Sequence, residues 1–96
     1  MNIHLTALIR CKPGHTAPFK SLLKALVNAS NEEEACLKYE LYQTASDDCQ
    51  FIFQETWKDQ EGLDLHNQQP HLLGFLKSAE ALMDGNVLVY STNRLY

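Results

Sequence analysis

The residues best suited to chemistry are two histidines and a glutamate in the second half of the chain, His66, His71 and Glu55. Histidine titrates near neutral pH, so it is the side chain best suited to proton transfer under ordinary conditions. We predict that His66 is a general base, with His71 as the second candidate. Glu55 could orient His66 by a hydrogen bond, or exchange a proton itself if burial raises its pKa.

Aromatic residues recur at every second position around Glu55, as Phe51, Phe53 and Trp57. In a strand this spacing places them on one face, where they could line an apolar pocket that orients a planar substrate and excludes water. Trp57 could also stack on such a substrate, and Tyr39 on the preceding strand is a further candidate contact. The alternative is that these aromatic side chains are only core and that Glu55 pairs with an amide or a histidine for stability.

No metal site is expected from the spacing of these histidines. His66 and His71 are five residues apart and a proline intervenes, so they do not form the i, i+4 pair that a helix would present to a metal. Cysteines give no zinc or disulfide framework either, because they are odd in number and form no CxxC pair. The three cysteines are Cys11, Cys36 and Cys49.

Alternating and helical patterns predict the elements that position these residues. The expected elements, in order, are strand 3–10, helix 16–30, strands 36–44 and 49–57, helices 59–66 and 70–83, and strand 87–96. Thr16 and Asp59 are the expected N-caps of the first two helices. The acidic run from Glu32 to Glu34 is interpreted as a solvated helix end or loop.

This βαββαβ order predicts an α+β, ferredoxin-like fold, a four-stranded antiparallel sheet with helices on one face, in a single domain over residues 1–96. The other sheet face would expose apolar side chains, and such a face usually marks association. We therefore expect a homodimer packed through the open sheet faces. The residues expected on that face include Leu8, Tyr42, Ile52 and Leu88 or Tyr90.

Charge and hydropathy exclude several classes of partner. The formal net charge is −4 and the lysines are scattered, so no basic patch for nucleic acid is expected. No stretch approaches the roughly 20 apolar residues that span a bilayer, so no membrane partner is expected. The first residues lack a basic region followed by an apolar run, so we expect no signal peptide and a cytoplasmic location.

Several short motifs together resemble the antibiotic biosynthesis monooxygenase (ABM) domain over nearly the whole chain. The most specific set is Glu55-x-Trp57 followed by His66 and Pro70-His71. The remaining pieces are Gly14 and Phe19, the segment Glu33 to Leu41, Phe51-x-Phe53, Asp59 and Phe75. The likeness is greatest to the quinol-monooxygenase-like branch of this dimeric α/β-barrel superfamily.

The resemblance implies a dimer with a pocket between sheet and helices and, for some members, oxidation of polycyclic phenols or quinols by O₂ without metal or flavin. Two positions depart from the family pattern. The usual Glu-Pro-Gly-Cys turn is here Glu33-Glu34-Ala35-Cys36, which implies a looser loop. Haem-degrading relatives carry an asparagine where this chain has Ala7, which argues against haem breakdown.

Three functions remain open from the sequence. The first is a cofactor-independent monooxygenase acting on a quinol or phenol. The second is a non-oxidative isomerase of a small oxo compound or lactone, and the third is a non-catalytic small-molecule-binding dimer. A flat apolar pocket would favour the first function and a small polar pocket the second. The third predicts that His66 is tightly packed, with no cavity beside Trp57.

Overall fold

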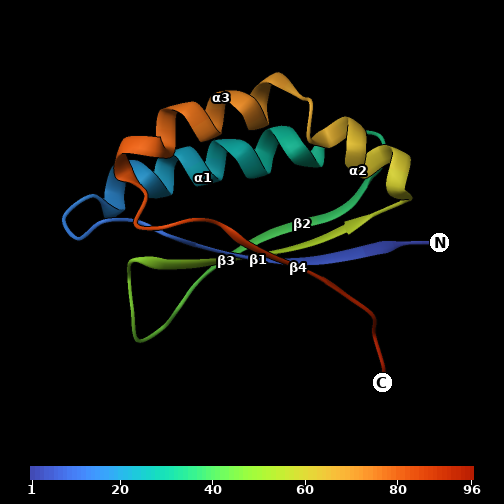
Figure 1. Cartoon of the computed structure of the whole chain (residues 1–96), viewed down its shortest axis with the longest axis horizontal. Coiled ribbons are helices and arrows are strands. Elements are labelled where there is room, and N and C mark those ends of the chain that lie inside the picture. Colours follow the sequence, from blue (N-terminus) through green and yellow to red (C-terminus); the bar gives the residue numbers. More distant parts are fainter.

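The computed structural model, which describes residues 1–96, has one antiparallel sheet with all its helices on one face (Figure 1). The strand order across the sheet is β2-β3-β1-β4. This is the predicted ferredoxin-like βαββαβ arrangement, with the second helical segment divided in two at Pro70. The strands are β1 (Ile3–Arg10), β2 (Cys36–Gln43), β3 (Gln50–Trp57) and β4 (Leu88–Thr92); the helices are α1 (Thr16–Asn31), α2 (Gln60–His66) and α3 (Pro70–Ala79), followed by the 3-10 turn η1 (Glu80–Leu82).

The two central strands, β1 and β3, place their odd-numbered residues toward the helices. Glu55 lies opposite Leu5, and Trp57 lies opposite Ile3. Burial alternates strictly along β3, with every second residue buried. The core therefore forms between this sheet face and α1 to α3, and it confirms the predicted period-two pattern.

Strand β2 departs from simple alternation near its start. The pairing of β2 with β3 shifts between Cys36 and Lys38, which marks a β-bulge. As a result Leu37 is 54% exposed, although we expected it to share a face with Tyr39. Beyond the bulge the alternation is regular, and Tyr39 is buried opposite Glu55.

Helix beginnings and strand ends differ slightly from the predicted ones. Asp59 caps α2 as predicted, accepting a 2.8 Å hydrogen bond from the backbone of Gly62. Thr16 is not an N-cap but the first residue of α1, and no side chain caps that helix. The last strand ends at Thr92 rather than residue 96, since its pairing with β1 ends where Thr92 lies opposite His4, the second residue of β1.

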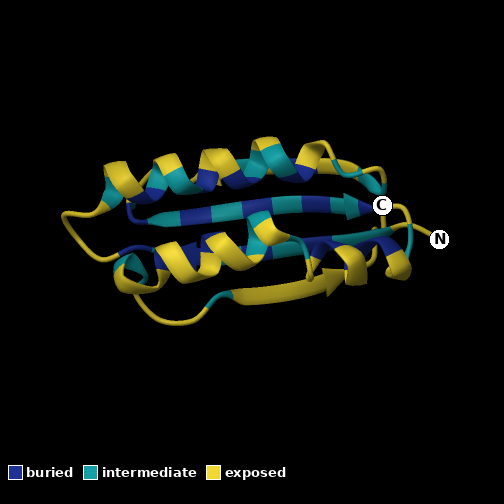
Figure 2. Ribbon diagram, turned by 90° about the horizontal axis from the view of Figure 1, so that it is seen from above, coloured by how far each residue is buried: buried dark blue, intermediate teal, exposed yellow.

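Strand β4 lies at the margin of the sheet, beyond the cover of the helices. All five of its residues are exposed, and Figure 2 shows it as an uncovered strand beside the buried centre. Its outer edge has no strand partner. The chain then leaves the body of the molecule toward its C-terminus (Figure 1). None of the helices combines the length and apolar character needed to cross a membrane.

Candidate active site

A cavity of about 350 Å³ lies between the sheet and the helices. Twelve of its 15 lining residues are hydrophobic, and the polar ones are Glu55, His66 and Asn67. Val87 and Val89 line it on the side of the uncovered edge strand. The cavity is thus an apolar chamber with a few polar groups, as is typical of a site for a small organic molecule.

His66 is the last residue of α2 and projects into the core beside this cavity. Only 3% of it is exposed. Its Nδ1 lies 2.6 Å from Oε2 of Glu33, and its ring stacks on Trp57 with centroids 4.4 Å apart. Since a carboxylate only accepts hydrogen bonds, Nδ1 is the donor in this contact, and in the neutral imidazole Nε2 is the nitrogen with the lone pair. His66 is therefore held in the tautomer and orientation that a general base needs.

Glu33 is the functional candidate that the sequence interpretation missed. We expected the run from Glu32 to Glu34 to be solvated, but the Glu33 side chain is only 11% exposed. Its Oε2 accepts hydrogen bonds from His66 and, at 2.8 Å, from Nε2 of His71. Glu32 and Glu34 are exposed as expected, but the expectation was wrong for Glu33, because its side chain reaches His66 of α2 and His71 of α3. The available signal was the glutamate of the family turn motif.

Glu33 also lines a separate hollow of about 300 Å³ outside the apolar cavity. Only two of the nine residues around this hollow are hydrophobic. The polar ones include Lys58 and Glu61. One carboxylate thus joins His66, which faces the apolar cavity, to a polar surface depression. Glu33 therefore contacts the buried histidine and also borders the polar hollow.

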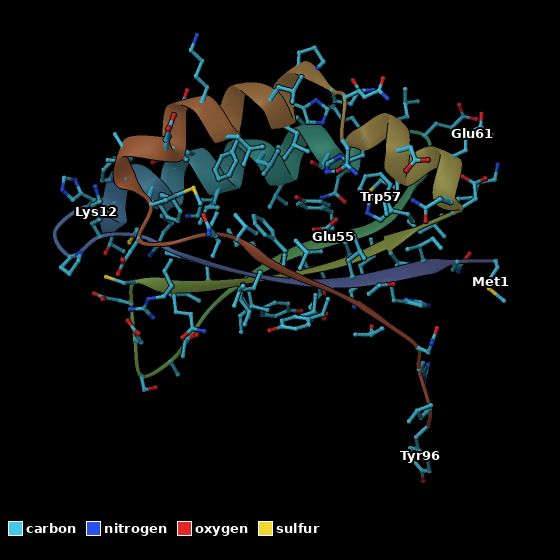
Figure 3. The ribbon with its side chains drawn as sticks, viewed as in Figure 1. Met1, Lys12, Glu55, Trp57, Glu61 and Tyr96 are labelled. Atoms are coloured by element: carbon cyan, nitrogen blue, oxygen red, sulfur yellow. The ribbon has the colours of Figure 1, made fainter.

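Glu55 lies under the helix layer, between the sheet and α2 (Figure 3), and lines the cavity. Of the two roles expected for Glu55, the hydrogen bond to His66 is not formed. Its Oε1 instead accepts a 2.9 Å hydrogen bond from Nε1 of Trp57, the nearest donor on the same strand face. Burial raises the pKa of Glu55, and the nearby charge of Glu33 raises it further.

The predicted substrate contacts divide into two groups. Tyr39 and Phe53 line the cavity, with their rings 5.3 Å apart. Burial raises the pKa of Tyr39, so its hydroxyl stays neutral. Trp57 and Phe51 do not line the cavity. They are completely enclosed, because Trp57 lies under His66 and Phe51 packs on Phe19 at 5.8 Å.

His71, at the start of α3, is likewise absent from the cavity lining. Its ring centroid lies 6.0 Å from that of His66, the two rings share the Glu33 carboxylate, and the His71 side chain is 24% exposed. The structure therefore makes His71 a second donor to Glu33 rather than a neighbour of the cavity. Through this hydrogen bond, His71 helps to fix the position of the Glu33 carboxylate.

Glu33, His66 and His71 are also the residues that could hold a metal ion. Their ligand atoms all lie within 4.8 Å of one another, and two imidazoles with one carboxylate can bind a divalent metal. Histidine spacing did not indicate this set, because the third member comes from a distant turn. In this structure the three side chains are joined by hydrogen bonds, a short one of 2.6 Å from His66 and one of 2.8 Å from His71.

Replacing Glu55 by glutamine should stabilise the fold at alkaline pH. A carboxyl whose folded pKa is raised binds its proton more tightly in the folded state, so stability falls as pH rises from the unfolded pKa, about 4.3, through the folded one. Glutamine can still accept from Trp57 and carries no charge. Thermal unfolding from pH 5 to pH 8 should show a flatter decline for Glu55→Gln than for wild type. The exposed control Glu80→Gln should keep the wild-type slope, and an equally steep decline in Glu55→Gln would contradict the assignment.

Comparison with known proteins places this site in a family context. The sequence profile described as "Antibiotic biosynthesis monooxygenase" matches residues 2–78. The Bacillus subtilis protein named "Putative monooxygenase YcnE" is 31% identical over 90 residues, covering 94% of this chain and 95% of that protein.

Solved structures agree with the fold. The crystal structure of PA3566 from Pseudomonas aeruginosa superposes with a TM-score of 0.92 at 36% identity, covering 99% of this chain and 95% of that one. Rv0793 from Mycobacterium tuberculosis gives a TM-score of 0.91 at 23% identity, covering 100% of this chain and 97% of that one. The latter likeness concerns the fold alone.

Proposed function

Because this chain belongs to the antibiotic biosynthesis monooxygenase family, we propose that it oxidises a quinol or other phenol with O₂ in the apolar cavity, without metal or flavin. The single observation that supports this most strongly is the cavity itself. A volume of about 350 Å³ lies within the range of about 300–1,000 Å³ typical of small-molecule sites and is large enough for a phenol with two fused rings. Its mainly hydrophobic lining suits a fused aromatic ring.

The proposed chemistry begins with removal of a phenolic proton by Nε2 of His66. Glu33 accepts the Nδ1–H bond and so stabilises the imidazolium that forms. The electron-rich substrate anion then reduces O₂. One oxygen atom is added to the ring and the other leaves as water, so a quinol and one O₂ yield a hydroxyquinone and one water. The apolar walls keep bulk water from the anion.

Two other functions are less well supported by the cavity. An isomerase of a small polar oxo compound would be expected to have a small, polar pocket, whereas 12 of 15 lining residues here are hydrophobic. A non-catalytic binding dimer would pack His66 without adjacent space. His66 is tightly stacked on Trp57 on one side, but it also borders the cavity.

Oxygen uptake by the wild-type protein with a panel of reduced naphthoquinones tests the proposal. We expect uptake with stoichiometric formation of the hydroxyquinone, unchanged after dialysis against a chelator. No uptake on any member of the panel would remove the monooxygenase proposal. Uptake lost on chelation and restored by a divalent metal would instead assign Glu33, His66 and His71 as metal ligands.

We also propose that two copies associate through their open sheet faces. The pairing of the four strands places one apolar residue of each strand in a row across this face. The row consists of Tyr42, Ile52, Leu8 and Leu88. Tyr42 and Leu88 are each 51% exposed, so burying this row would remove apolar surface from water.

The three free cysteines fit the reducing cytoplasm that we propose as the location.

The wild-type protein should be a dimer at micromolar concentration, as measured by light scattering after size-exclusion chromatography. Leu88→Glu should shift it to monomer, because two like charges would meet on the buried face. Leu73 is similarly exposed, at 53%, but lies on α3 in the helix layer. The control Leu73→Glu should remain dimeric, and a monomeric wild type would exclude this interface.

A further inference from the structure

Two cysteine thiols and a threonine hydroxyl meet at the opposite end of β1 and β3 from Trp57. Cys11 follows the last residue of β1, and Cys49 precedes the first residue of β3. Thr16 begins α1, and its Oγ1 lies 3.7 Å from the sulfur atom of each cysteine. This cluster is outside the cavity and has no part in the proposed oxidation of a phenol.

The backbone places the two thiols opposite each other. The β1–β3 register ends with Arg10 opposite Gln50, and its continuation sets Cys11 opposite Cys49, with a 2.9 Å bond from the Cys11 amide to the Cys49 carbonyl. Opposed residues of antiparallel strands have Cα atoms about 4.5–5.5 Å apart, and disulfides span about 4.4–6.8 Å. Both side chains are buried on the helix side, like Ile9 and Phe51. A bond between them therefore needs little backbone movement.

We propose that Cys11 and Cys49 are a redox-active pair that forms a reversible cross-strand disulfide with hydrogen peroxide as the oxidant. The Cys49 thiolate attacks one peroxide oxygen, the O–O bond breaks, and a sulfenic acid and one water result. The Cys11 thiolate then attacks the Cys49 sulfur, the S–O bond breaks, and a second water leaves. Two thiols lose two electrons and two protons, and one peroxide becomes two waters.

The exposure of the two thiols and the groups around them indicate which cysteine reacts with peroxide first. Cys49 is 8% exposed and Cys11 is fully enclosed, so peroxide reaches Cys49 first. Thr16 can donate its hydroxyl hydrogen to a thiolate at the N-terminal end of α1, where the helix dipole favours negative charge. That hydroxyl lowers the pKa of Cys49, but burial and the neighbouring Cys11 raise it more, and the net direction is upward. The reaction should therefore accelerate as pH rises.

Cys36 is the internal control for this pair. It is free and only partly buried, and it lies at the start of β2, away from both partners. Burial raises the pKa of Cys36 to about 11, and the pKa of Cys49 is raised as well, so the lack of an opposed thiol is what sets Cys36 apart. Its partner across the sheet is Trp57 and not a cysteine, and its thiol lies 3.9 Å from Oδ1 of Asn31.

Peptide mapping of the full chain after peroxide treatment at pH 8 tests the proposal. Trypsin cleaves after Arg10, Lys20, Lys24, Lys38 and Lys58 and leaves the Lys12–Pro13 bond intact, so each cysteine lies on a different peptide. We expect a link between peptides 11–20 and 39–58, a fall from three free thiols to one, and a Tm higher by roughly 10 °C. A reductant should reverse all three changes.

Matched variants make the outcome specific. Cys36→Ser should give the same linked peptides, and Cys49→Ser should give no linked peptide within one chain. Retention of all three thiols in the wild type would overturn the proposal, as would linkage of Cys36 or links only between chains. The wild-type measurement decides the question even if a serine variant at a buried position does not fold.

Discussion

Replacing His66 by alanine should lower kcat for O₂ uptake on a reduced naphthoquinone by roughly 10²- to 10⁴-fold. The reason is that His66 lines the apolar cavity while its Nδ1 is engaged by Glu33, so Nε2 is the nitrogen proposed to take the substrate proton. The matched control is His15→Ala, an exposed histidine that precedes α1 and makes no side-chain cap. Rates are measured with an oxygen electrode at saturating substrate.

An unchanged rate in His66→Ala would discard this base while leaving the reaction class open. His66→Gln provides a second variant that fills more of the space against Trp57, so that loss of packing and loss of the base can be separated. If both variants fold and both lose activity to a similar extent, the lost group is the imidazole base and not its volume.

The role of Glu33 as a positioning residue can be separated from a structural one by Glu33→Gln. A neutral amide can donate to Nδ1 of His66 as well as accept from it, so the fixed tautomer should be lost. We expect kcat to fall by roughly 10-fold or more, with a smaller effect than in His66→Ala. The ¹⁵N chemical shifts of the His66 ring report the tautomer directly, and no change there would exclude this role.

The largest effect on stability should come from Gly62→Ala in α2. A Cβ atom built on Gly62 would lie 2.3 Å from the Cβ of Ala35, far inside contact distance. The α2 backbone and the turn after α1 would have to separate, which costs about 1–3 kcal/mol or more. In a domain of this size that lowers Tm by roughly 5–20 °C, measurable by thermal denaturation.

The contact itself provides the control for this prediction. Ala35→Gly removes the opposing Cβ, so the double variant Ala35→Gly/Gly62→Ala should recover most of the lost stability. Gly74 lies in α3 with nothing within 4 Å of an added Cβ, and Gly74→Ala should be neutral or stabilising by about 0.5–1 kcal/mol. A double variant no more stable than Gly62→Ala would exclude the steric explanation.

Gly62 also connects the fold to the site. Because it lets α2 approach the turn that carries Glu33, the close contact with Ala35 helps to bring that carboxylate near His66, at the end of the same helix. This chain has Ala35 where the family motif has glycine, so the approach relies on Gly62. The sequence pattern did not single out Gly62, because a pattern along one helix does not show which residue of another segment lies against it.

The elements and the faces of the sheet were predictable from local patterns. Alternation along 3–10 and 49–57 correctly predicted that Phe53, Glu55 and Trp57 share the face under the helices. This works because the side-chain direction in a strand reverses at every residue, so the pattern of apolar residues records which face is buried. The bulge after Cys36 was not predictable, since it arises from pairing between strands.

The sequence by itself determined the ferredoxin-like order of elements and the presence of His66 and Glu55 near an apolar face, because local periodicity and capping encode both. Only the tertiary structure decided which groups meet. It brought Glu33 from a turn to two histidines more than thirty positions away, and it enclosed Trp57 beneath His66. Such contacts depend on how α2 and α3 pack on the sheet, and no local pattern of residues specifies that packing. The predicted base, His66, is consequently better defined than before, as one member of a Glu33–His66 pair at the edge of an apolar cavity.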